Sequence, residues 1–108
     1  MPELPEVETI RRAIEPRIVG SSISAISLPD PSVAGAAGPE ALRASYGSTV
    51  RAVLRRGKHL ILLLERNRGI VLHLRMTGAV YMDTPEAEDS VRAIIEFSNG
   101  ERLIFVDM

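Results

Sequence analysis

The chain has 108 residues, 45% of them hydrophobic and 25% charged, with a net charge of −1. This length fits one compact domain and is too short for two separate cores. No apolar run is long enough to span a bilayer and no signal segment opens the chain, so we expect a cytoplasmic protein without a membrane partner. There is no cysteine, and the two histidines lie fourteen residues apart. This pattern excludes disulfides and thiolate sites and argues against a metal in this chain.

The charge is unevenly distributed along the chain. Positions 51–76 hold seven basic residues and a single acid, Glu65, for a local charge of +6. The basic residues are Arg51, Arg55, Arg56, Lys58, Arg66, Arg68 and Arg75. The overall charge argues against a nucleic-acid binder, whereas this segment is either a solvated strand face or a surface for a polyanion.

The first predicted element is an amphipathic helix from about Leu4 to Val19. Its apolar residues recur at intervals of three and four, at Leu4, Val7, Ile10, Ile14 and Ile18. The outer face would carry Glu8, Arg11, Arg12 and Glu15. Pro16 should kink or end the regular helix, and Gly20 is a natural stop.

Short strands dominate the rest of the chain. A strand over Ile23–Leu28, a loop over 29–38 and one helical turn over 39–43 lead into three runs that predict an antiparallel meander. These runs are Val50–Leu54, His59–Leu64 and Ile70–Met76, with turns at 55–57 and 67–69. Ser98-Asn99-Gly100 between two apolar runs, Val91–Phe97 and Arg102–Val106, predicts a hairpin. The fold class is therefore α+β and mostly β: six to eight antiparallel strands in a β-sandwich or flattened barrel, with the N-terminal helix packed on it.

The amino terminus is the first candidate for chemistry. Removal of Met1 would leave Pro2 as a secondary amine beside Glu3, and an unprotonated amine can form a Schiff base with an electrophilic carbon. Glu6 would lie near the same helix end as Glu3. The alternative is that these acids only complement the helix dipole.

Three further residues are candidates because of their places at strand ends. Lys58 follows a basic turn, where it suits phosphate contact or proton donation, although lysine also blocks edge strands. His73 ends a strand with its side chain on the face opposite Leu74. Met76 beside a turn could wedge into a base stack or could fill the core.

Four motifs together resemble the N-terminal domain of bacterial formamidopyrimidine-DNA glycosylases. They are Pro-Glu-Leu-Pro-Glu-Val-Glu-Thr at 2–9, Arg-Arg-Gly-Lys at 55–58, His-Leu-Arg-Met-Thr-Gly at 73–78 and Ser-Asn-Gly at 98–100. Leu4 and Val7 resemble the opening sequence of these glycosylases more than that of the endonuclease VIII branch of the family. The resemblance covers essentially all of residues 1–108, which we treat as one catalytic domain.

The resemblance implies a base-excision repair enzyme that removes oxidised purines, such as 8-oxoguanine and formamidopyrimidines, and then cuts damaged double-stranded DNA as a lyase. Pro2 would be the nucleophile and Glu3 the proton shuttle, while Glu6 would orient the terminus. Lys58 would contact DNA and donate a proton during β-elimination. Met76 would fill the gap left by the flipped base.

Two DNA-contacting positions remain. His73 matches a phosphate contact of the family, and Arg92 stands about where the family has a DNA-contacting histidine. No obligatory protein partner is implied.

The chain also departs from the family pattern. The family's helix–two-turn–helix domain and its zinc finger, with one zinc, lie outside these residues, so we expect weak or absent activity of the isolated domain. While Met1 is attached, the Pro2 nitrogen is an amide and not a nucleophile. The alternative is a non-catalytic DNA-binding or structural module. A tautomerase with an N-terminal proline base is a third, less fitting reading, because its short βαβ architecture is not predicted here.

Overall fold

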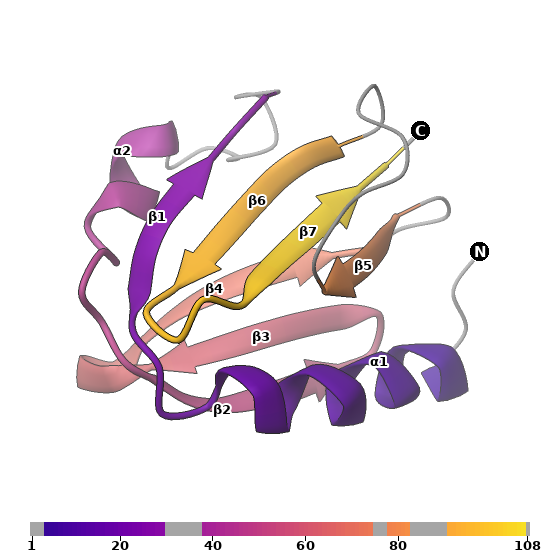
Figure 1. Ribbon diagram of the computed structural model, residues 1–108. Helices are drawn as coiled ribbons and strands as arrows, with labels where there is room; N and C mark the ends of the chain where they lie inside the picture. The colour runs from indigo at the N-terminus through magenta and orange to yellow at the C-terminus, as the bar shows by residue number, and fades with distance from the viewer. Residues whose placement is uncertain (1–3, 30–37, 75–77, 83–90, 108) are drawn as a thin grey trace.

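Two antiparallel sheets and a long N-terminal helix form the domain. The structure, a computed structural model, describes residues 4–29, 38–74, 78–82 and 91–107, with only the backbone at 4–6, 38, 39 and 41 (Figure 1). In chain order the elements are α1 (Leu4–Ile18), β1 (Ile23–Ser27), α2 (Gly38–Arg43), β2 (Val50–Arg56), β3 (His59–Leu64), the 3₁₀ turn η2 (Glu65–Asn67), β4 (Arg68–His73), β5 (Ala79–Met82), β6 (Val91–Phe97) and β7 (Arg102–Val106). The predicted sandwich with a packed N-terminal helix is confirmed.

The two sheets differ in strand order. One has the order β1-β6-β7-β5, and the other is the meander β2-β3-β4. They face each other, and α1 lies beside β2 along the edge of the three-stranded sheet (Figure 1). All neighbouring strands pair antiparallel. Short connections account for this in β2–β3, β3–β4 and β6–β7.

The core lies between the sheets and follows the alternation of each strand. In β3, Leu60, Leu62 and Leu64 are at most 1% exposed, whereas the residues between them are half-buried. Phe97 and Leu103 contribute from the opposite sheet. Burial of each large side chain stabilises the fold by about 1.5–3 kcal/mol, so this alternation also settles the register.

Helix α1 buries the face that its sequence predicts. Val7, Ile14 and Ile18 are at most 2% exposed. The helix does not end at Pro16, contrary to one expectation, and continues to Ile18. A proline so near the C-terminal end of a helix removes a single backbone hydrogen bond. The Val19 N–H still donates to the Glu15 carbonyl at 3.0 Å.

The β-turns lie close to the predicted positions, with two shifts. Strand β2 extends through Arg56, and the turn falls on 57–58 because Gly57 takes a positive φ of 58°. After β3 the chain turns earlier than predicted, with Arg66 and Asn67 at positive φ, so the predicted turn residues Arg68 and Gly69 belong to β4.

The last hairpin is confirmed, with β6 and β7 at the predicted bounds and Gly100 at φ 89°. Sequence analysis did not place β5, which is only four residues long. None of the described helices is long and apolar enough to cross a membrane.

Candidate functional site

The predicted site residues fall into three groups. Pro2, Glu3 and Met76 lie outside the described residues, and Glu6 is described only as backbone near the start of α1. Lys58, His73 and Arg92 are described with their side chains. The site is therefore built from the elements that flank the amino terminus.

Lys58 lies in the two-residue turn between β2 and β3. Its carbonyl accepts a hydrogen bond from the Leu74 N–H at 3.4 Å, which ties the turn to the end of β4. Its side chain is half-buried and has no hydrogen bond or ion pair with any residue in the described part of the chain. An ammonium at a sheet end that has no partner among the described residues is available to an anion.

His73 stacks on a second histidine that sequence analysis did not single out. His59 and His73 are direct partners across β3 and β4, and their rings lie 4.1 Å apart at an interplanar angle of 23°. Arg56 on β2 is the register partner of His59 on β3, so Arg56, His59 and His73 form one row across the three strands. We call Arg56, Lys58, His59 and His73 the basic rim.

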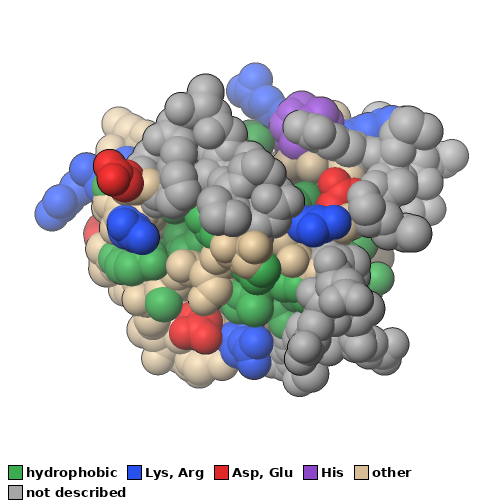
Figure 2. Space-filling model, turned by 90° about the horizontal axis from the view of Figure 1, so that it is seen from above, with side chains coloured by type: hydrophobic (Ala, Val, Ile, Leu, Met, Phe, Trp, Pro, Cys, Tyr) green, Lys and Arg blue, Asp and Glu red, His purple; other side chains and the backbone are tan. Residues whose placement is uncertain are grey.

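The basic rim lies at the surface. Histidine is visible there with Lys or Arg side chains beside it (Figure 2). His73 and Arg56 are exposed, and Arg56 has no hydrogen bond or ion pair within the described ranges. Such side chains suit the phosphate backbone of a nucleic acid, which carries most of the affinity in such complexes.

Arg92, on β6, is placed differently. Its Nε donates to the Asp107 carbonyl at 3.0 Å, and its side chain is half-buried. It belongs to the four-stranded sheet and so is not part of the basic rim. Its predicted DNA contact remains a prediction.

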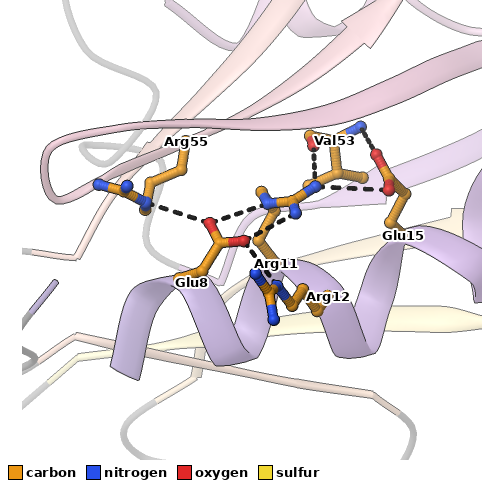
Figure 3. Close-up of polar contacts among 6 residues, drawn as sticks. All are labelled: Glu8, Arg11, Arg12, Glu15, Val53 and Arg55. Atoms are coloured by element: carbon orange, nitrogen blue, oxygen red, sulfur yellow. Dashed lines mark hydrogen bonds and ion pairs between the residues drawn. The ribbon is translucent and has the colours of Figure 1, made fainter. Parts of the chain in front are cut away.

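Glu8 joins the helix to the sheet at the end where the basic rim lies. Its carboxylate accepts from Arg11 at 2.7 and 3.0 Å, from Arg12 at 2.9 Å and from Arg55 Nε at 3.2 Å (Figure 3). The hydrogen bond from Arg11, followed by that from Arg12, lowers the pKa of Glu8 to about 2. Glu8 is thus ionised at every ordinary working pH.

A second set of contacts attaches α1 to the backbone of β2. Arg11 Nη1 donates to the Val53 carbonyl at 3.1 Å, and the Val53 N–H donates to Glu15 Oε2 at 3.0 Å (Figure 3). Because β2 is an edge strand, these side chains occupy backbone groups that would otherwise be open to strand pairing.

Sequence analysis interpreted Glu8, Arg11 and Glu15 as the outer face of the helix. The structure corrects this interpretation, because all three are half-buried and contact the sheet or bridge to it. Their spacing of three and four predicts pairing within the helix. The same spacing does not predict the contacts with Val53 and Arg55, which lie 38 residues or more away in the sequence.

Solved structures that share this arrangement belong to one class of protein, the DNA glycosylases. A structure of MutM in complex with DNA containing carbocyclic 8-oxo-G matches with a TM-score of 0.87 at 37% identity, covering 99% of this chain and 41% of that one. A Lactococcus lactis Fpg complex with DNA containing an abasic site gives 0.86 at 37% identity, covering 98% of this chain and 40% of that one.

The chain belongs to the formamidopyrimidine-DNA glycosylase N-terminal domain family, which matches residues 1–108. The formamidopyrimidine-DNA glycosylase of Mycobacterium leprae is 38% identical over 99% of this chain, and that of Geobacillus kaustophilus is 41% identical over all of it. The chain spans only 39% and 40% of these two relatives. The predicted family is thus confirmed.

Proposed function

We propose that this chain supplies the catalytic N-terminal domain of a glycosylase and lyase that repairs oxidised purines in double-stranded DNA. The observation that carries the proposal is membership of a family whose relatives are named formamidopyrimidine-DNA glycosylases, in a chain that opens Met-Pro-Glu. Lys58, which has no partner among the described residues, and the basic rim support DNA as the substrate. Damaged DNA in the matching MutM and Lactococcus lactis complexes points the same way.

Pro2 would act as nucleophile once Met1 is removed. Its nitrogen lone pair forms a bond to C1′ of the damaged nucleotide, and the bond from C1′ to the base breaks with its electron pair leaving on the base. After loss of the nitrogen's proton, the sugar oxygen leaves C1′ and the iminium forms. Glu3 would carry protons to the departing groups, and Glu6 would orient the terminus.

The lyase steps follow from the iminium. It acidifies the C2′ hydrogen, so that loss of this proton expels the 3′ phosphate, and a second elimination expels the 5′ phosphate. Lys58 would contact the DNA and donate a proton in the first elimination. His73 and Arg92 would hold the backbone, and Met76 would occupy the space of the flipped base. The zinc implied for the family's zinc finger lies outside these residues and has no role in this proposal.

The test is borohydride trapping on abasic-site DNA, read by intact mass. The chain lacking Met1 should give one covalent adduct, and Pro2→Gly and the chain that retains Met1 should give none. An adduct that persists in Pro2→Gly would contradict the assignment of the nucleophile. At DNA concentrations that saturate binding, the weak affinity expected of this chain is offset, so binding with no adduct would instead favour a non-catalytic DNA-binding module.

A further inference from the structure

We infer that Arg55 is a positioning residue that holds the start of α1 and the Lys58 turn in a fixed relation. The inference rests on the proposed function, because it concerns how the Pro2 end of the helix and Lys58 would reach one sugar. Arg55 is not among the residues to which the family resemblance gives a role.

Arg55 contacts both sides of this junction. Its Nε donates to Glu8 Oε1 at 3.2 Å, and its Nη1 approaches the Gly57 carbonyl at 3.5 Å. Gly57 directly precedes Lys58. One guanidinium therefore links a helix that begins two residues after Pro2 to the turn that carries the lysine.

The local structure directs Arg55 to this place. Arg55 is the partner of buried Leu60 in the sheet register, so its side chain leaves β2 on the core side and emerges at the strand end toward α1 (Figure 3). It is only 31% exposed. A planar guanidinium can satisfy two acceptors in different directions at once, which the single ammonium of a lysine does less well.

The other arginines on Glu8 cannot make this link. Arg12 contacts Glu8 from within the same helix, and its side chain is 74% exposed. Arg11 joins α1 to the sheet at Val53, four residues before the turn. Among the contacts of Glu8 in the described part of the chain, Arg55 alone comes from another element.

Such a link matters for the proposed reaction because a displacement of about 1 Å can cost about a hundredfold in rate. Nucleophile and proton donor must both lie within hydrogen-bonding reach of the same sugar. The loss of Arg55 should therefore slow the chemical step more than it weakens DNA binding.

The experiment compares Arg55→Gln with Arg12→Gln, each as the chain lacking Met1. Both substitutions remove one arginine charge and one contact to Glu8, but only the first breaks the link from Glu8 to the sheet. At saturating abasic-site DNA we expect trapping to slow about tenfold in Arg55→Gln and to stay near wild type in Arg12→Gln. Arg55→Lys should recover part of the rate, and the DNA concentration for half-saturation should change equally in the two Gln variants.

Amide hydrogen exchange of residues 56–59 provides a readout that does not depend on chemistry. It should be faster in Arg55→Gln than in Arg12→Gln. Equal trapping rates and equal exchange in the two variants would overturn the inference, as would a loss confined to half-saturation, which would make Arg55 a phosphate contact. Saturating DNA offsets the weak affinity expected of this chain. Failure of wild type to trap under that condition, with faster exchange in Arg55→Gln alone, would therefore overturn the proposed function and leave the structural link standing.

Discussion

Two hairpins hold α1, one near each end, and they use their polar groups in opposite ways. The β6–β7 turn binds the last turn of the helix: Asn99 Nδ2 donates to the Arg17 carbonyl at 2.8 Å, and Glu101 pairs with Arg17 at 2.5 Å. Asn99 Oδ1 also accepts from the Glu101 N–H at 3.0 Å. At the other end, the β2–β3 hairpin binds Glu8 through Arg55.

The difference lies in what remains unbound. Ser98 in the β6–β7 turn exchanges hydrogen bonds with the Ser22 backbone through both its amide and its hydroxyl, so that turn is held by contacts within the domain. The β2–β3 hairpin leaves the charged groups of Arg56 and Lys58 without any described partner. Both turns contain a glycine at positive φ, but the β6–β7 turn binds other parts of the domain, whereas the β2–β3 turn presents charged groups that a ligand can bind.

The largest effect that we expect is the loss of cleavage rate on substitution of Lys58, and it tests the contrast between the two hairpins. Lys58→Gln should slow strand cleavage at abasic-site DNA about a hundredfold, because a positioned general acid contributes about 10²–10⁴-fold. Thermal melting should stay within a degree or two of wild type, since the ammonium has no described internal partner. Cleavage rate and melting temperature are measured on the same preparation. Wild-type cleavage by Lys58→Gln would break the comparison.

Asn99→Ala should show the reverse pattern. It removes the hydrogen bonds to the Arg17 carbonyl and from the Glu101 amide, at about 1–2 kcal/mol in the free energy of unfolding. The rate of trapping should be unchanged, because the opposite end of α1 keeps its contacts. Urea unfolding and single-turnover trapping provide the two readings. A large loss of trapping without loss of stability would show that both hairpins act on the reaction.

A smaller effect, the pH dependence of the free energy of unfolding, distinguishes the two ends of α1. The pKa of Glu8 falls from 4.5 to about 2 on folding, so its contribution to stability is complete above pH 4.5 and is lost as the pH falls through about 2. The Asn99 amide does not titrate. Urea unfolding of wild type and Glu8→Gln should therefore differ at neutral pH, and the difference should shrink between pH 4.5 and 2. A difference that is constant with pH would contradict the role of the Glu8 charge.

Local patterns explain which parts of the fold could be predicted. Period-two alternation and the Asn-Gly pair place β6 and β7 at their observed bounds, and the three- and four-residue spacing of Val7, Ile14 and Ile18 places the buried face of α1. β5 was missed because four residues give too short a pattern. The turn after β3 was misplaced because Arg66 and Asn67, which are not glycine, adopt positive φ.

The sequence by itself determined the family and the mostly β class, because these depend on short motifs and on the period of each element. The roles of Pro2, Glu3 and Lys58 remain predictions. Only the tertiary structure decided that Glu8 meets Arg55, 47 residues away, and that His59 stacks on His73. Periodicity says which face of an element is apolar, whereas the partner of a polar side chain depends on which distant strand end the packing brings beside it. For this reason the contacts that join α1 to the basic-rim end of the sheet could not be read from the chain alone.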